Sequence, residues 1–141
     1  MAHALAAVHR HGLVHGELHP EAILVAPDGT PLLAEFRVAR VVGDPARREG
    51  RTPDSVVWSA PEVLDGAAPS VAADVYSLGA VLFELIGGAP PFPVGPDDTV
   101  DAVVARITSM PPAPLGEDVP ADVTAAITQA LSRDPAARPV S

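Results

Sequence analysis

The sequence predicts a mostly α-helical domain with one small β-hairpin. Apolar residues recur with helical spacing in four segments, whereas a single pair of short apolar runs brackets a strong turn signal. No internal repeat is visible, and the order of elements is a helix, a hairpin, a loop and then further helices. The 141 residues fit one domain or part of one, and 48% of them are hydrophobic, which is enough for a packed core.

The first predicted helix covers residues 1–11. Its apolar side chains Met1, Leu5 and Val8 share one helical face, and Gly12 directly after them is typical of a helix C-terminus. This segment lacks a capping residue at its start, so the helix begins abruptly.

The predicted hairpin joins residues 23–25 to residues 32–34. Between these two apolar runs, residues 27–30 read Pro-Asp-Gly-Thr, which is a strong turn signal. Residues 40–54 are dominated by arginine, glycine, aspartate and proline, so we expect them to form an exposed and mobile loop.

Three further helices are predicted in the second half of the chain. The strongest begins at Ser70 and ends at the glycine pair 87–88, the next covers residues 97–109, and the last follows the loop 111–120. The apolar residues with helical spacing are Val75, Leu78, Val81, Leu82, Leu85 and Ile86, then Val100, Val103, Val104 and Ile107, then Val123, Ile127 and Leu131.

Composition excludes several classes of function. The net charge of −9 argues against nucleic acid or an anionic membrane surface as the main partner, because either would be repelled. The longest apolar window, residues 78–92, is interrupted by Glu84, glycines and prolines, so we expect a buried helix and no membrane span. The chain has no cysteine for a disulfide or a thiolate metal site, and no signal peptide opens it. We therefore expect a soluble, cytoplasmic protein.

Five motifs occur in an order and at spacings that resemble one family. Residues 15–24 read HGELHPEAIL, residues 33–40 read LAEFRVAR, residues 60–62 read APE, residues 74–79 read DVYSLG, and residues 134–139 read DPAARP. They resemble the catalytic loop, the segment around DFG, the APE motif, the start of the central helix and the arginine loop of eukaryotic-type, bacterial-like Ser/Thr protein kinases. The resemblance covers nearly the whole chain and implies the C-terminal lobe of a kinase.

The resemblance also implies how the domain is organised. Residues 1–141 would be a partial kinase-like domain, with a catalytic loop at 13–25, an activation segment at 35–62 and a helical subdomain at 70–141. A whole kinase has an N-terminal lobe whose glycine-rich loop and strand lysine hold the nucleotide phosphates. The sequence shows no such glycine-rich loop, and the chain contains no lysine. We therefore expect a truncated lobe with the N-terminal lobe absent.

The positions that carry chemistry in this family are altered. Glu17 stands at the position of the catalytic-base aspartate, and His19 replaces the lysine that stabilises the transferring phosphoryl group. Ala22 replaces the asparagine that binds magnesium, Glu35 replaces the metal-binding aspartate of DFG, and Arg37 replaces its glycine. Phosphoryl transfer depends on positioning and electrostatic stabilisation, and a misplacement of about one ångström costs on the order of 100-fold. The resemblance therefore implies a degenerate, pseudokinase-like site.

Residues with structural roles in the family are retained. By resemblance, His15 and Phe36 are spine positions that stack through the lobe. Asp74 would accept hydrogen bonds from the backbone of the catalytic loop, and Glu62 and Arg138 would form a buried ion pair. Keeping both members of such a pair fits a folded lobe, because removing one is costly.

Three further features of the sequence concern regulation and metal binding. Gly16 replaces the arginine that reads activation-loop phosphorylation in many kinases, so we expect that switch to be absent. Thr52 and Ser55 are candidates for phosphorylation by another kinase, although ordinary polar loop residues are the simpler interpretation. An alternating run of potential metal ligands includes His9, His11, His15, Glu17 and His19. The kinase pattern has histidines at the positions of His9 and His15 for packing, which is a simpler explanation than a metal site.

Three functional hypotheses follow from the sequence. The first is a non-catalytic interaction or regulatory module that binds a protein partner in the groove beside residues 97–109 and the polar loop. The second is a weak Ser/Thr kinase, or a fragment of one, that uses Mg-ATP, with Glu17 as the base and Glu35 holding magnesium. The third is a remnant whose product lacks a complete fold. No cofactor is expected unless activity survives.

Overall fold

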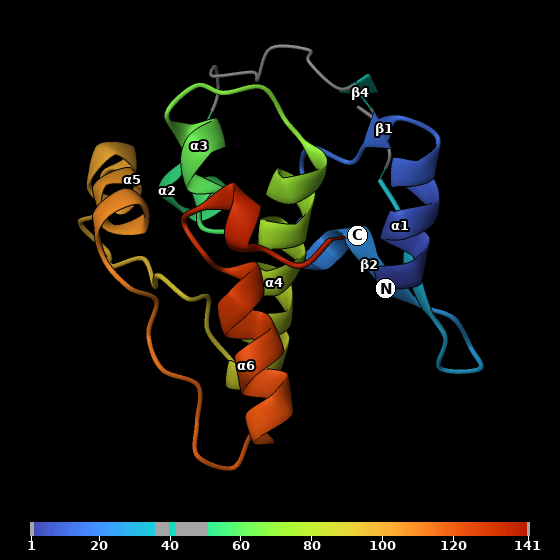
Figure 1. The fold of residues 1–141 in the computed structure, drawn as a ribbon. Helices are drawn as coiled ribbons and strands as arrows, with labels where there is room; N and C mark the ends of the chain where they lie inside the picture. The colour runs from blue at the N-terminus through green and yellow to red at the C-terminus, as the bar shows by residue number, and fades with distance from the viewer. Residues whose placement is uncertain (1, 36–39, 42–50, 141) are drawn as a thin grey trace.

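One long helix organises the fold. The computed structural model describes residues 2–35, 40–41 and 51–140, and Figure 1 shows α4 (Val71–Gly87) in the middle of the molecule. Helix α1 (Ala2–Arg10) and helix α5 (Val100–Ser109) lie on opposite sides of it, while α6 (Ala121–Ala130) packs along it. The predicted mostly helical fold class is confirmed.

Both ends of α4 have the residues that helix termini need. The Ser70 hydroxyl accepts a hydrogen bond from the Ala73 backbone N–H at 3.1 Å, which satisfies one of the unpaired donors of the first turn. Gly88 adopts a left-handed conformation with φ 78°, and its N–H donates to the Glu84 carbonyl. A glycine accepts this conformation without the steric penalty of a side chain, so the helix ends where the glycine pair predicted.

Helix α4 separates two hydrophobic clusters. The smaller cluster joins the catalytic-loop segment to α1 and α4 through Leu5, Leu18, Leu78 and Val81. The larger cluster lies among α4, α5, α6 and two short helices, α2 (Pro53–Val56) and α3 (Pro61–Leu64). Its buried members are Val56, Val57, Ala60, Val63, Ala73, Tyr76, Ala80, Phe83, Phe92, Val103, Ile107, Ile127 and Leu131. A helix buried on nearly all sides carries apolar residues around most of its circumference, as α4 does.

Gly79 allows α4 and α6 to approach closely. A Cβ atom added at this position would lie 2.8 Å from the Cβ of Ala130, which is too short for a real contact. The backbones of the two helices are therefore closer here than any side chain larger than hydrogen would permit.

The predicted hairpin is confirmed, with its second strand one residue earlier than expected. Strand β2 (Ile23–Val25) pairs antiparallel with β3 (Pro31–Leu33) in the register Ile23↔Leu33 and Val25↔Pro31. In the turn, the Asp28 carboxylate accepts a hydrogen bond from the Thr30 N–H at 2.9 Å, which holds the pKa of Asp28 below its ordinary value.

The prediction of an exposed loop over residues 40–54 is wrong at both ends. Strand β4 (Arg40–Val41) pairs antiparallel with β1 (Leu13–Val14), forming a second two-stranded sheet that the sequence did not predict. At the other end, α2 begins at Pro53, because Thr52 and Ser55 form a capping box that supports its first turn. Residues 42–50 lie outside the described part of the chain.

The remaining elements are two single-turn 3-10 helices. One, η1 (Pro20–Ala22), connects the catalytic-loop segment to β2, and the other, η2 (Pro135–Ala137), follows α6. Within the described residues, no helix has both the length and the apolar character needed to cross a membrane.

Candidate active site and its supporting network

The catalytic-loop segment runs from β1 through η1 into β2. Proline at the first position of η1 fixes its backbone, and the Ala22 N–H donates to the His19 carbonyl at 3.0 Å. Along this segment Glu17 is exposed, His19 is half-buried and Ala22 is fully buried. Glu17 makes no hydrogen bond or ion pair with any other residue in the described ranges. A carboxylate in this position is free to meet a ligand, whereas the Ala22 methyl group offers nothing to a metal ion.

Two of the altered positions contact each other. The Nε2 atom of His19 lies 3.4 Å from Oε2 of Glu35, and the two side chains are 27% and 35% exposed. Glu35 follows β3 and adopts a left-handed conformation with φ 61°, which is unfavourable for a residue with a side chain. The structure thus brings together the residues that stand at the phosphate-cation and metal-ligand positions of the family.

Trp58 joins this pair to the central helix, a contact that the sequence did not predict. Its ring centroid lies 6.2 Å from that of His19, with the planes tilted by 41°. Its indole N–H donates to a carboxylate oxygen of Glu84 on α4 at 2.6 Å. The signal available in the sequence is that this residue is the single tryptophan of the chain and lies two positions before the APE motif.

Asp74 fixes the backbone of the catalytic-loop segment to α4. Its carboxylate accepts hydrogen bonds from the His15 N–H at 2.7 Å and from the Gly16 N–H at 2.8 Å, which are the contacts that the resemblance implies. The Nε2 atom of His9 on α1 lies 2.8 Å from the same carboxylate. Since Asp74 is only 1% exposed, these donors replace the water that the charge would otherwise need.

His15 connects the catalytic-loop segment to the chain before Glu35. It is buried, and its Nε2–H donates to the Ala34 carbonyl at 3.0 Å. Its expected partner in the spine, Phe36, lies outside the described residues, as does Arg37. The stacking of His15 on Phe36 therefore stays a prediction.

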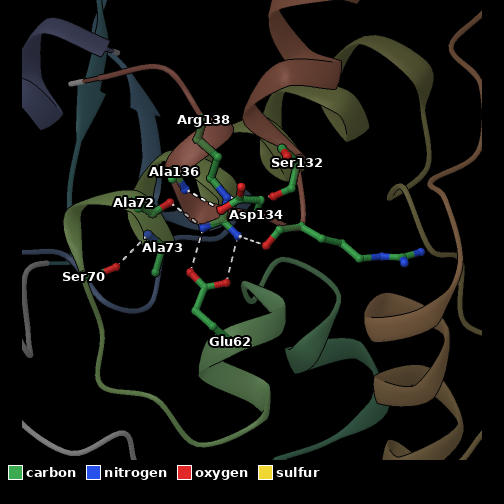
Figure 2. A network of polar contacts seen from close by, with 9 residues as sticks. Glu62, Ser70, Ala72, Ala73, Ser132, Asp134, Ala136 and Arg138 are labelled. Carbon is green, nitrogen blue, oxygen red and sulfur yellow. Dashed lines mark hydrogen bonds and ion pairs between the residues drawn. The ribbon is translucent and has the colours of Figure 1, made fainter.

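Arg138 forms the most extensive polar network in the described part of the chain (Figure 2). It binds the Glu62 carboxylate through two parallel hydrogen bonds, NH1 to Oε1 at 2.7 Å and NH2 to Oε2 at 2.8 Å. Its remaining donors reach the carbonyls of Ala72 at 2.9 Å, Ser132 at 2.8 Å and Arg133 at 3.2 Å. All five N–H donors of the guanidinium are thereby used.

The ion pair of Glu62 and Arg138 is buried, as the resemblance implies. The Arg138 side chain is 0% exposed and that of Glu62 is 21% exposed. The Arg138 guanidinium also stacks 5.0 Å above the ring of Tyr76. Burial raises the pKa of Tyr76, and the nearby Arg138 charge offsets only part of this rise. Helix α3, helix α4 and the loop before η2 are held together at this point.

Thr52 and Ser55 are engaged with each other. The Ser55 N–H donates to the Thr52 hydroxyl at 3.2 Å, the Thr52 N–H donates to the Ser55 hydroxyl at 2.8 Å, and both residues are exposed. Their phosphorylation stays a prediction, and a phosphate on either hydroxyl would disrupt this capping box. As for metal ligands, the part of the chain that the structure describes brings no three histidine or acidic residues close enough to hold an ion.

Comparisons with known proteins show the family of this chain. The family model described as a protein kinase domain matches residues 1–141. The chain is similar to the serine/threonine-protein kinase PknK of Mycobacterium bovis, with 42% identity over 142 residues that cover 100% of the chain and 13% of PknK. It is also similar to PknA of Mycobacterium tuberculosis, with 35% identity over 136 residues that cover 96% of the chain and 31% of PknA.

A solved structure has the same fold. The kinase PK-1 of the Cydia pomonella granulovirus superposes with a TM-score of 0.80 and 21% identity, over 96% of this chain and 49% of PK-1. The chain thus spans less than one third of the length of these bacterial relatives and about half of the viral kinase. With its whole length matched by the family model and its polar network in place, the chain belongs to the protein kinase domain family.

Proposed function

We propose that this chain is a catalytically impaired kinase C-terminal lobe that acts as a protein-interaction or regulatory module. The observation that carries the proposal is the contact between His19 and Glu35, whose Nε2 and Oε2 atoms lie 3.4 Å apart. The imidazole of His19 here faces the carboxylate that would have to bind the metal. Each of these two side chains thus has the other as a partner, and neither is held in position for a nucleotide.

The donor set supports the same proposal. Magnesium needs near-octahedral oxygen coordination, and of the two positions that bind it in the family, Ala22 has no ligand atom and Glu35 has one carboxylate. Glu17 keeps a carboxylate at the base position, but one extra methylene shifts its oxygens by about one ångström. Losing the metal clamp and the fixed cation together removes most of the electrostatic stabilisation on which phosphoryl transfer depends.

A module without efficient catalysis would act through its surface. The residues that support the fold are intact, so a stable surface can be presented to a protein partner, and the groove beside α5 is the face we propose for binding. The net charge of −9 makes a nucleic acid an unfavourable partner. We place this module in the cytoplasm as part of the same proposal.

Phosphate incorporation tests the loss of catalysis. The chain would be incubated with magnesium and γ-labelled ATP, alone and with a general protein substrate, beside the Glu17→Ala variant. The proposal predicts equal background labelling in both. Labelling of the wild-type chain that disappears in Glu17→Ala would contradict it, because a functioning base would then be present.

A second candidate is a weak Ser/Thr kinase, or a piece of one, and the 42% identity to PknK favours it. Since the chain covers 13% of that relative, a catalytic partner lobe would have to come from flanking sequence or from a second chain. Reading the coding frame upstream of Met1 distinguishes the two candidates. A glycine-rich loop and a strand lysine encoded there would favour the kinase, and their absence would favour the interaction module.

The remnant hypothesis has its own readout. A product that unfolds without cooperativity and binds hydrophobic dyes would favour a remnant without function. A single cooperative transition would support the folded module on which the proposal depends.

A further inference from the structure

A pocket of about 480 Å³ lies between α4, α5, α6 and η2. Its apolar wall is made by Phe92, Ile107 and Leu131, all of which are buried. Among the described residues, none from the catalytic-loop segment lines it, and neither does Glu35. The pocket is therefore separate from the candidate active site, and its size suits one aliphatic side chain with part of a peptide backbone.

The polar wall of this pocket contains a hydroxyl group without a partner. Tyr76 lines the pocket and is 1% exposed, and its hydroxyl makes no hydrogen bond to any of the residues that the structure describes. Burial raises the pKa of Tyr76, so the hydroxyl stays protonated at neutral pH and remains a donor. No described residue occupies this donor, so an acceptor entering the pocket would replace only water as its hydrogen-bond partner.

The same pocket also carries a positive charge. Arg133 lines the same pocket, is exposed, and pairs with no carboxylate in the described ranges of the chain. Burial raises the pKa of Tyr76, and the positive charges of Arg138 and Arg133 both act to lower it. The charge of Arg138 is balanced by Glu62, whereas that of Arg133 is not. In a chain of net charge −9, Arg133 therefore provides a local positive charge that attracts an anion.

We propose that this pocket docks a protein segment in which an aliphatic residue is followed by an acidic residue. The aliphatic side chain packs on Phe92, Ile107 and Leu131, and the carboxylate accepts a hydrogen bond from the Tyr76 hydroxyl and pairs with Arg133. This inference rests on the proposed function as an interaction module, for which it names the chemistry of the partner. It is independent of whether phosphate transfer occurs.

Peptide probes of matched shape test the proposal. The ¹H–¹⁵N spectrum of the 14.4 kDa chain would be recorded during titration with three capped peptides: acetyl-Gly-Leu-Asp-Gly-amide, its Asn analogue and its Ala-Asp analogue. The proposal predicts shifts confined to residues around Tyr76, Ile107 and Leu131. The Leu-Asp peptide should bind at least about 5-fold more tightly than either analogue, because each analogue lacks one of the two interactions.

Variants separate recognition from a general structural effect. Tyr76→Phe keeps the ring under Arg138 and removes the hydroxyl, and Arg133→Gln removes the charge; each should reduce the preference for Asp over Asn to about 2-fold or less. Arg10→Gln on the exposed end of α1 should leave it unchanged. Equal binding of the Asp and Asn peptides, shifts elsewhere, or no shift at about 10 mM peptide would overturn the proposal. Labelling by γ-labelled ATP would contradict only the proposed loss of catalysis, so the two failures are distinguishable.

Discussion

Two pairs of a carboxylate and a nitrogen base in this molecule differ in almost every physical respect. Glu62 and Arg138 are joined by two short hydrogen bonds with the arginine fully buried, and every remaining N–H donor of that arginine meets a carbonyl. Glu35 and His19 have one contact at 3.4 Å and are about one third exposed. The first pair holds three segments of the chain together, whereas the second lies at a surface where water can replace either partner.

The same difference separates two aspartate positions of the family. Asp74 is retained, buried and contacted by three groups from two segments of the chain. Glu17, at the base position, is exposed and changed. Substitutions at exposed catalytic positions affect the fold little, while substitutions in a buried network affect it strongly. Asp74 and Glu17 are thus divided by their burial, whereas the altered position Ala22 is itself buried as a small apolar residue that packs without a polar partner.

The largest expected effect is on the buried ion pair. Arg138→Met should lower the free energy of unfolding by about 3–5 kcal/mol, because Glu62 and three carbonyls lose their donors. Denaturant titration followed by circular dichroism measures this, and complete loss of cooperative unfolding would agree with it. Arg10→Met, at an exposed site, is the matched control and should change stability by less than about 0.5 kcal/mol. A loss below about 1 kcal/mol for Arg138→Met would contradict the role given to this network.

The second effect compares two carboxylates of the catalytic region. Asp74→Asn should reduce the free energy of unfolding by about 2–4 kcal/mol, since the amide places a donor against backbone N–H groups that need an acceptor. Glu17→Gln should change it by less than about 0.5 kcal/mol. Similar losses for both variants, measured under the same conditions, would remove the distinction between buried and exposed positions.

A smaller effect is expected at His19 and Glu35. A double-mutant cycle with His19→Ala and Glu35→Ala should give a coupling energy of about 0–1 kcal/mol, as is usual for an exposed pair with one contact. The measurement is again the free energy of unfolding. A coupling above about 2 kcal/mol would mean that this pair supports the fold as Glu62 and Arg138 do.

The smallest effect concerns a third, exposed pair. The Asp98 carboxylate accepts hydrogen bonds from Arg106 and from the Gly95 N–H, and these hold its pKa below the ordinary value. A lowered folded-state pKa means that the stabilisation is present above the unfolded pKa of about 3.9 and is lost as the pH falls through the folded value. Asp98→Asn should therefore flatten the fall in thermal midpoint below about pH 4, whereas Asp101→Asn should leave the profile unchanged. An unchanged profile in Asp98→Asn would show that this pair contributes nothing.

Much of the fold could be predicted because its signals are local. The period of apolar residues in α4 and the capping residues Ser70 and Gly88 lie within one segment, as does the turn between β2 and β3. Strands β1 and β4 have two residues each, too few to show a period. Their pairing, Leu13↔Val41 and Val14↔Arg40, joins residues that are far apart in the chain. Helix α2 did carry a local signal, the capping box of Thr52 and Ser55 with Pro53 at the first helical position between them, within a stretch that otherwise reads as a loop.

The candidate site was predictable where the family resemblance supplies partners. The contacts of Asp74 and of Glu62 with Arg138 join residues far apart in the chain, and only the order of motifs indicates them. The position of Trp58 between His19 and Glu84 depends on tertiary packing, which no local pattern encodes. The pocket around Tyr76 likewise needs three helices in place before it exists.

The central claim is that the supporting network persists while the metal and nucleotide site does not. The most direct test is the free energy of unfolding of the chain with and without 10 mM magnesium and 1 mM ATP, since any ligand that binds the folded state raises it by RT ln(1 + [L]/Kd), about 2.7 kcal/mol at 100 times Kd. We predict cooperative unfolding with a change below about 0.3 kcal/mol. A rise above about 1 kcal/mol that requires magnesium and disappears in Glu35→Ala would contradict the account.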